Sequence, residues 1–249
     1  MKNDGPVVLI LGVSKGIGLA TALELLSTDA IIYGVSRTKP LNEQLLSSPR
    51  FFFSSFDLRD SKGARNIVKD VLERWNRINC IIYNAGTLEP LSRLEHLKSD
   101  EFLSSFHLNT WTMMEIIQEA LPMLRKEKAK VIAVSSGAAV KARQGWGSYC
   151  IAKASMNMMM QAWAVEEPDV VFIAFRPGVV DTDMQKLIRE KGRESMGTDH
   201  EAFLNLDLLD PQVPARALTY LAFKASSSQS GQFVDLKSLE FVPFWTVQQ

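Results

Sequence analysis

Tyr149 and Lys153 are four residues apart in the stretch Tyr-Cys-Ile-Ala-Lys. Residues at this spacing share one face of a helix, so the phenol and the ammonium would be neighbours there. A nearby positive charge favours the ionised form of a phenol, whose ordinary pKa is about 10. Such a pair is suited to proton transfer near neutral pH. Surface neighbours without any function have the same spacing, so the rest of the chain must decide between these two interpretations.

A glycine-rich stretch follows the first apolar run. Residues 7–11 are aliphatic, as in a strand buried on both faces, and Gly12-Val-Ser-Lys-Gly-Ile-Gly comes next, before a helical pattern. A helix N-terminus after a glycine turn binds pyrophosphate through free N–H groups. The spacing G-x-x-x-G-x-G is not the commoner G-x-G-x-x-G, and a simple strand-to-helix turn is the alternative. The residues predicted to bind a dinucleotide here are Gly12, Ser14, Lys15, Gly16, Ile17 and Gly18.

The second predicted strand, residues 30–35, is followed by Ser36-Arg37. An NAD site normally has an acidic residue near the end of this strand, whereas an arginine there suits the 2′-phosphate of NADP. Neither Asp nor Glu occurs between Ala30 and Pro40. Arg37, with Lys15 as a second positive charge, therefore favours NADP(H) over NAD. The alternative is that Arg37 is a solvated loop charge.

The remaining pattern alternates strands with helices. Further strands are predicted at 51–56, 78–83, 131–134, 170–175 and 231–235, and helices at 19–26, 61–75, 100–125, 147–167 and 211–224. This predicts one α/β domain over residues 1–249, a Rossmann-type doubly wound sheet of about seven mainly parallel strands with helices on both faces. Ligands bind beyond the carboxyl ends of such strands, so the residues after each strand should line one crevice.

The composition limits the class of partner. There are 28 basic and 28 acidic residues, which argues against nucleic acid or an anionic membrane as the main partner. Two cysteines give no disulfide framework, so we expect a reducing, cytoplasmic setting. No stretch approaches the ~20 apolar residues of a membrane helix, and the three histidines lack metal-ligand spacing. A small-molecule partner and no metal are therefore expected.

The motifs together resemble the short-chain dehydrogenase/reductase family along nearly the whole chain. The resemblance rests on Gly12-x-x-x-Gly16-x-Gly18, Asn84-Ala85-Gly86, Asn109, Ser136, Tyr149-x-x-x-Lys153 and Pro177-Gly178. Residues 145–149 and 177–185 carry a narrower resemblance to fungal sepiapterin-reductase-like or benzil-reductase-like members. One departure is Leu11, which stands where family members usually have threonine.

The resemblance implies a role for each matching residue. Tyr149 would donate a proton to a carbonyl oxygen, and Lys153 would lower the pKa of Tyr149 and hold the nicotinamide ribose. Ser136, with Ser135 as the competing candidate, would bind the substrate oxygen, and Asn109 would order a proton-relay water. The implied cofactor contacts are Asn84, Ala85 and Gly86 at the adenosine, Asp57 and Leu58 at the adenine, and Pro177, Gly178, Val179, Val180 and Thr182 near the nicotinamide.

Substrate and subunit contacts are predicted from apolar residues. Residues 183–210 are polar and weakly periodic, which predicts a mobile lid; a disordered surface insertion is the alternative. Substrate would contact Trp146, Val180, Met184, Phe203 and Leu206, which favours a hydrophobic ketone or dicarbonyl, aromatic ones included. The helix with Met156, Met158, Met159, Met160 and Trp163 is apolar except along Lys153, Asn157 and Gln161. It favours a homodimer or homotetramer over core packing alone.

Three functional hypotheses follow. The favoured one is an NADPH-dependent carbonyl reductase with Tyr149 as the proton donor. The second is an NADP-binding regulatory protein with little catalysis, which the complete catalytic set disfavours. The third is an NAD-dependent alcohol dehydrogenase, which Arg37 disfavours.

Overall fold

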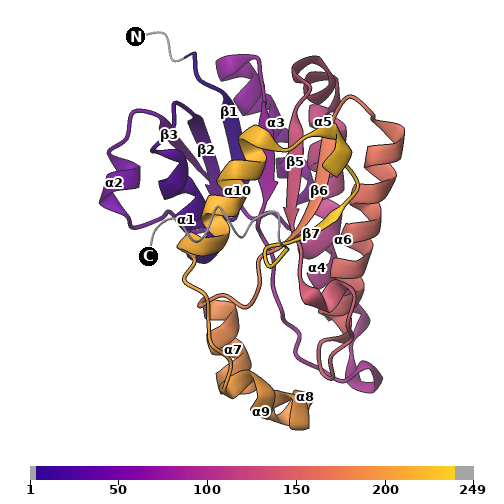
Figure 1. Cartoon of the computed structure of the whole chain (residues 1–249). Helices are drawn as coiled ribbons and strands as arrows, with labels where there is room; N and C mark the ends of the chain where they lie inside the picture. Colours follow the sequence, from indigo (N-terminus) through magenta and orange to yellow (C-terminus); the bar gives the residue numbers. More distant parts are fainter. Residues whose placement is uncertain (1–3, 239–249) are drawn as a thin grey trace.

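A seven-stranded parallel sheet forms the centre of the computed structural model, which describes residues 4–238. Helices cover both faces of the sheet (Figure 1). The strands lie in the order β3-β2-β1-β4-β5-β6-β7, and every neighbouring pair is parallel. Their bounds are β1 Val7–Leu11, β2 Ile31–Ser36, β3 Phe51–Ser55, β4 Cys80–Tyr83, β5 Lys130–Val134, β6 Val171–Arg176 and β7 Phe233–Asp235. The predicted single-domain Rossmann-type fold is thus confirmed.

The aliphatic strands are explained by burial on both faces. Along β1, Val7 and Leu9 pack into the hydrophobic cluster on one face of the sheet, and Val8 and Ile10 pack into the cluster on the other. Alternate side chains of a strand point to opposite faces, so a strand between two helical layers needs apolar residues at every position.

Two helical layers enclose the sheet. Side chains from α3 Ser61–Trp75, α5 Thr112–Glu127 and α6 Gly147–Glu166 belong to the first cluster, and side chains from α1 Gly16–Leu25, α2 Glu43–Leu46 and α10 Gln212–Lys224 belong to the second. The short helix α2 was not predicted. Single 3₁₀ turns lie at Leu94–His96, Gly137–Ala139 and Ser227–Gln229.

The predicted helix over residues 100–125 is interrupted. Helix α4 covers Ser99–Phe106, a π-helical turn covers His107–Trp111, and α5 follows. The predicted charges do lie at the two ends, with Asp100 and Glu101 in the first turn of α4 and Arg125 and Lys126 in the last turn of α5. The wider turn places Asn109 inside the protein, fully buried, and leaves Trp111 46% exposed. π-turns of this kind often occur at functional sites.

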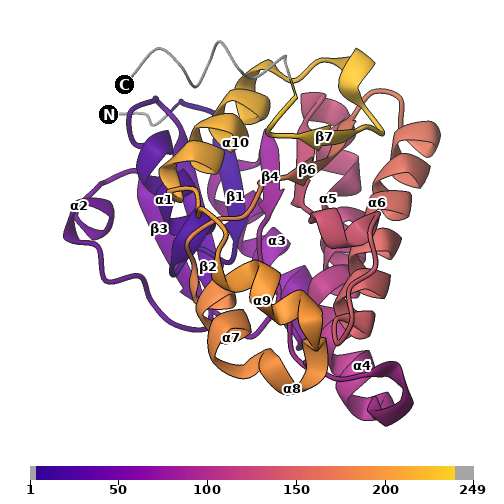
Figure 2. The same cartoon turned by 60° about the horizontal axis from the view of Figure 1, so that its bottom comes forward.

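Residues 183–210 contain three short helices rather than irregular chain. These are α7 Asp183–Lys191, α8 Arg193–Met196 and α9 Thr198–Leu204. They lie beyond the carboxyl ends of the strands, and Figure 2 brings this end of the molecule forward. The alternative of a disordered insertion is therefore wrong. Residues 183–210 have a polar surface, but Gln185, Ile188, Met196 and Phe203 form a buried face of this segment.

Candidate active site

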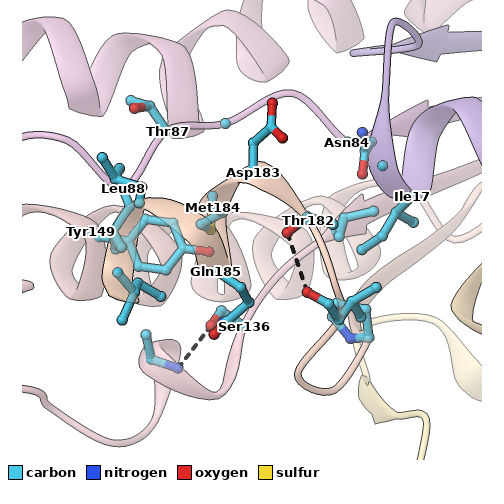
Figure 3. A pocket seen from close by; sticks show the side chains of 18 of the residues that line it. Ile17, Asn84, Thr87, Leu88, Ser136, Tyr149, Thr182, Asp183, Met184 and Gln185 are labelled. Atoms are coloured by element: carbon cyan, nitrogen blue, oxygen red, sulfur yellow. Dashed lines mark hydrogen bonds between the residues drawn. The ribbon is translucent and has the colours of Figure 1, made fainter. Parts of the chain in front are cut away.

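A cavity of about 1720 Å³ follows the carboxyl ends of the strands and continues under α7 and α9. Figure 3 shows part of it, with Tyr149 and Ser136 facing residues of the 182–185 segment. Its volume exceeds that of most small-ligand pockets, which leaves room for a dinucleotide and a substrate together. The predicted site residues that line it are Lys15, Gly16, Ile17, Arg37, Asn84, Gly86, Ser136, Trp146, Tyr149, Lys153, Pro177, Gly178, Val179, Val180, Thr182, Met184 and Phe203.

Other predicted residues do not line the cavity, namely Gly12, Ser14, Gly18, Asp57, Leu58, Ala85, Asn109 and Leu206. Gly12 has a φ of +91°, which favours glycine, and an added Cβ would lie 2.8 Å from the Ala85 nitrogen. The Asn84 amide donates to the Gly12 carbonyl over 2.8 Å. Gly12 and Ala85 therefore join the ends of β1 and β4, where the strand order reverses. In open α/β sheets this reversal marks the ligand crevice.

The N-terminus of α1 is suited to bind phosphate. Its N-cap residue, Lys15, forms no side-chain capping bond, and the first turn contains no acidic residue. The first N–H groups of the helix are therefore available to an anion, and the helix dipole favours negative charge there. The strand-loop-helix thus fits a dinucleotide pyrophosphate. The ammonium of Lys15 forms an ion pair with Asp183 at the start of α7, and their hydrogen bond holds the pKa of Asp183 below its usual value.

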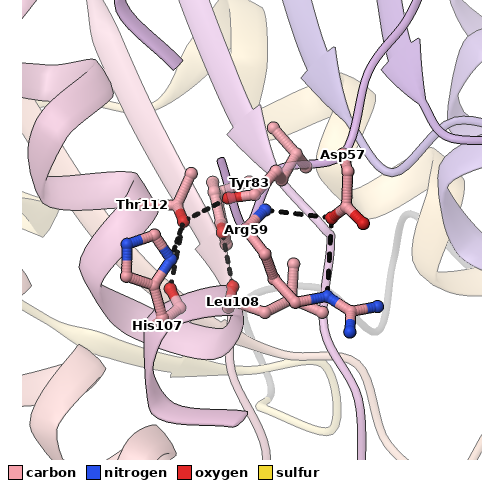
Figure 4. Close-up of polar contacts among 7 residues, drawn as sticks. Asp57, Arg59, Tyr83, His107, Leu108 and Thr112 are labelled. Atoms are coloured by element: carbon pink, nitrogen blue, oxygen red, sulfur yellow. Dashed lines mark hydrogen bonds and ion pairs between the residues drawn. The ribbon is translucent and has the colours of Figure 1, made fainter. Parts of the chain in front are cut away.

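The predicted adenine contact is arranged differently from the expectation. The Asp57 carboxylate accepts a hydrogen bond from the Arg59 backbone N–H at 3.0 Å and lies 3.4 Å from the Arg59 Nε (Figure 4). The Leu58 carbonyl accepts a hydrogen bond from the Thr112 hydroxyl. Arg59, which was not predicted, lines the cavity instead. Asp57 thus positions a cation at this end of the cavity. Arg59 lies four positions after the end of β3, and a cation shortly after a strand end was the signal that could have identified it.

Tyr149 and Ser136 form the centre of the site. Tyr149 is only 5% exposed, and burial raises the pKa of its phenol to about 12, although a hydrogen bond with Ser136 acts in the opposite direction. The pKa of Tyr149 is therefore raised, because desolvation of the phenolate outweighs the hydrogen bond with Ser136. The phenol consequently holds its proton at neutral pH. The lowering by Lys153 that the resemblance implies stays a prediction. The Ser135 hydroxyl instead donates to Asn157 over 2.5 Å, so Ser136 is the serine beside the phenol.

Lys153 is a buried ammonium. Its Nζ donates to the Val134 carbonyl at 2.8 Å and lies 5.7 Å from the centroid of the Tyr149 ring. Burial lowers the pKa of Lys153 to about 7, because the charged form loses its hydration. The predicted helical pairing of Tyr149 and Lys153 on α6 is present, and both side chains line the cavity.

Lys153 should make stability depend on pH. With its pKa near 7 when folded and 10.5 when unfolded, the unfolded chain binds more protons between these values, so the unfolding free energy should rise with pH. We expect Lys153→Met to remove up to about 1.4 kcal/mol per pH unit from the slope between pH 7 and 9. Urea unfolding without added cofactor measures this. The exposed Lys224→Met is the control, and an unchanged slope in Lys153→Met would contradict the assignment.

Asn109 has a side chain committed to the protein. Its Oδ1 accepts from the Thr87 N–H at 3.0 Å, and its Nδ2 donates to the carbonyls of Thr87 and Ser105 at 2.9 and 3.0 Å. The π-turn thereby fixes the segment that carries Gly86 and Thr87 in the cavity wall. Its predicted part in ordering a relay water rests on the resemblance alone.

One end of the cavity is apolar and aromatic. The ring centroid of Trp146 lies 5.0 Å from that of Phe203 and 6.1 Å from that of Tyr149. Leu88 and Ile188 belong to the same buried cluster, and Met184 packs against it. Leu206, also predicted to contact substrate, is 39% exposed and lies outside the cavity. The wall is thus suited to a hydrophobic molecule.

Gln185 lies within residues 177–185, which carry the narrower family resemblance, but the sequence predicts no role for it. It is 8% exposed and lines the cavity, and its Oε1 has no hydrogen-bond partner in the described part of the chain. The signal was available, because Gln185 precedes Ile188 by three positions and so shares its helix face.

No group of His, Cys, Asp or Glu within residues 4–238 is arranged to hold a metal ion, and none of the helices there is long and apolar enough to cross a bilayer.

The fold and the site together define a dinucleotide-binding α/β protein with a buried tyrosine and lysine on α6 and a half-buried serine just after β5. The family model for short chain dehydrogenases matches residues 6–193. The chain therefore belongs to the short chain dehydrogenase family and is an oxidoreductase of that family.

Named relatives and a solved structure agree with this assignment. A benzil reductase ((S)-benzoin forming) from Saccharomyces cerevisiae is 33% identical, over 92% of this chain and 95% of its own. Sepiapterin reductase from Rattus norvegicus is 30% identical, over 92% and 95%. The crystal structure of a short chain dehydrogenase/reductase from Saccharomyces cerevisiae aligns with a TM-score of 0.90 at 31% identity, covering 97% of this chain and 100% of that one. The narrower resemblance is thus confirmed.

Proposed function

We propose that the protein is an NADPH-dependent carbonyl reductase that acts on hydrophobic ketones or dicarbonyls. The bound dihydronicotinamide would supply the hydride to the carbonyl carbon. Tyr149 would give the phenolic proton to the carbonyl oxygen, so a ketone becomes a secondary alcohol. Ser136 would donate a hydrogen bond to the same oxygen, and Lys153 would hold the nicotinamide ribose. Donors already aimed at the oxygen stabilise the negative charge that develops there.

The observation that carries the proposal is the protonated phenol beside an aromatic wall. The phenol of Tyr149 is hydrogen-bonded to Ser136, and Trp146 and Phe203 offer an apolar surface next to it. The names of the benzil and sepiapterin reductases add support, since they describe reduction of carbonyl compounds. The test is NADPH oxidation with benzil, related diketones and pterin ketones. Absence of turnover with all of them, despite cofactor binding, would favour a regulatory protein.

The preference for NADPH is proposed from the charges around the adenosine end of the cavity. Lys15 and Arg59 line it, but each is paired with a carboxylate, Asp183 and Asp57 respectively. Arg37 is exposed, lines the cavity and has no ion pair among residues 4–238. It is therefore the cation most available to a 2′-phosphate.

Arg37→Ala should weaken NADPH binding while leaving NADH binding nearly unchanged. Loss of a charge-assisted phosphate contact costs about 1.5–3 kcal/mol, or roughly a tenfold to hundredfold rise in Kd. Fluorescence titration of both cofactors measures it. Lys39→Ala, which removes an exposed charge from the same loop outside the cavity, is the control. Equal losses for NADH and NADPH would contradict the preference, and would favour the NAD-dependent alcohol dehydrogenase.

The lid function of residues 183–210 is also a proposal. Helices α7 and α9 provide Met184, Ile188 and Phe203 to the cavity wall, so their displacement would open the apolar end.

Both cysteines are free thiols, which supports a reducing, cytoplasmic setting.

A homodimer or homotetramer is proposed from one surface of α6. Of its predicted apolar residues, Met156, Met159, Met160 and Trp163 are core residues, and only Met158 is exposed. Ile151, Met158 and Val165, here called the apolar stripe, are 43%, 62% and 83% exposed and lie seven residues apart. Positions at this spacing drift by only about 20° per step, so the three side chains share one side of the helix.

Met158→Lys should shift the protein toward monomers, because a buried, unpaired ammonium strongly opposes association. Light scattering after size-exclusion chromatography measures the mass. Lys224→Glu changes an exposed charge on another helix and serves as the control. A wild-type protein that is monomeric at micromolar concentration would refute the assembly.

A further inference from the structure

Gln185 is a buried polar side chain of the cavity wall that the mechanism above does not use. It lies in the first turn of α7, where its backbone N–H donates to the Thr182 carbonyl at 2.9 Å. Its side chain extends into the cavity on the side where Ser136 and Tyr149 lie (Figure 3). With 8% exposure, it is more buried than most glutamines in folded proteins. Contacts within the protein, rather than hydration, therefore determine where the Gln185 side chain lies.

The amide oxygen of Gln185 is unsatisfied. Its Oε1 is buried and has no hydrogen-bond partner among the described residues. Buried polar groups without partners oppose folding, and native proteins contain few of them. A methionine at this position would fill similar space without that cost. An unpaired amide facing a cavity therefore indicates a group that binds there.

The surroundings limit what this group can be. Leu88, Trp146 and Phe203 form an apolar wall at this end, while Ser136 and Tyr149 would already hold the reacting oxygen. Gln185 is thus placed to bind a second polar atom close to the first. The Nε2 of this amide would donate to a carbonyl oxygen, whereas Oε1, the unpaired atom, would accept from a hydroxyl.

We propose that Gln185 is a substrate-specificity residue that hydrogen-bonds the second oxygen of a vicinal dicarbonyl or α-hydroxy ketone. This inference rests on the proposed carbonyl reduction and specifies its substrate class. A site that hydrogen-bonds one substrate group discriminates against the analogue that lacks it, because the protein group is then left unpaired. The amide would also fix which of two neighbouring carbonyls meets Tyr149.

The test compares benzil with deoxybenzoin, which has the same carbon skeleton but only one carbonyl. Gln185→Met should lower kcat/KM for benzil at least tenfold, mainly through KM, and change that for deoxybenzoin less than twofold. The quantity to compare is the ratio of kcat/KM for benzil to kcat/KM for deoxybenzoin, measured in the variant and in the wild type. Because the greater intrinsic reactivity of the diketone affects both proteins equally, it cancels in this comparison. Gln44→Met, on the exposed side of α2 and outside the cavity, should leave the ratio unchanged.

Two further measurements separate the alternatives. NADPH affinity should be unchanged in Gln185→Met, and its melting temperature should not fall, since an unpaired polar group has been removed. An unchanged benzil-to-deoxybenzoin ratio, or weaker NADPH binding with equal losses for both ketones, would overturn the inference. Failure of the wild type to reduce either ketone would instead refute the proposed function. Calorimetric binding of benzoin would then test Gln185 alone: equal affinities in wild type and variant would overturn its role.

Discussion

Tyr149→Phe is expected to lower kcat for carbonyl reduction by about 10²- to 10⁴-fold, the usual contribution of a positioned general acid. The substitution removes only the hydroxyl, so the ring should keep its contact with Trp146. Cofactor affinity and melting temperature should change little. Because the raised pKa keeps the phenol protonated through neutral pH, wild-type activity in the reducing direction should not fall between pH 6 and 8 through loss of this proton.

Steady-state NADPH oxidation at saturating ketone measures the effect, and cofactor fluorescence confirms that the site is intact. Tyr220→Phe, on α10 at the opposite face of the sheet and outside the cavity, is the matched control. Undiminished turnover by Tyr149→Phe would remove the tyrosine from the chemistry. Water or another acid would then have to supply the proton.

Among substitutions that add one methyl group to the cofactor loop, Gly18→Ala should destabilise the protein most. An added Cβ would lie 1.9 Å from the Gly12 carbonyl oxygen and 2.6 Å from the Asn84 amide nitrogen. Both atoms take part in the hydrogen bond that closes the loop, so neither can move without opening it. We expect a loss of about 3 kcal/mol, or roughly 6–12 °C in melting temperature, together with loss of cofactor binding.

Differential scanning fluorimetry with and without NADPH measures both effects. Gly137→Ala is the matched control for stability, since its Cβ would meet only the far end of the Arg176 side chain at 3.1 Å. A Gly18→Ala protein with wild-type stability and cofactor-dependent stabilisation would show that the loop is not packed as described.

The sequence was most informative where a local pattern decides the structure. Burial of β1 on both faces requires its aliphatic run, and the glycine spacing requires a tight turn, so both could be predicted from neighbouring residues. The helical pairing of Tyr149 and Lys153 was predicted for the same reason. By contrast, the π-turn at His107–Trp111 depends on contacts of Asn109 with Thr87, 22 residues away, which no local pattern contains.

Electrostatics and the α7–α9 region were less predictable. The pKa of Tyr149 depends on how completely folding removes water, and this desolvation outweighs the hydrogen bond with Ser136. The partner of Lys15, Asp183, is 168 residues away. Helices α7 and α9 bury only a narrow face, so their apolar positions are sparse and the polar surface dominates the pattern. Gln185 lies on that narrow face.

The π-turn would connect the proposed assembly with the proposed catalysis. Its Thr110 hydroxyl donates to the Ala152 carbonyl of α6 at 2.8 Å, next to Ile151 of the apolar stripe, and Trp111 projects outward from the same turn. Asn109, on its inner side, braces the wall beside Lys153. A second subunit bound to this surface would contact the backbone that shapes the cavity of the first subunit. Dilution would then weaken catalysis before it unfolds the chain.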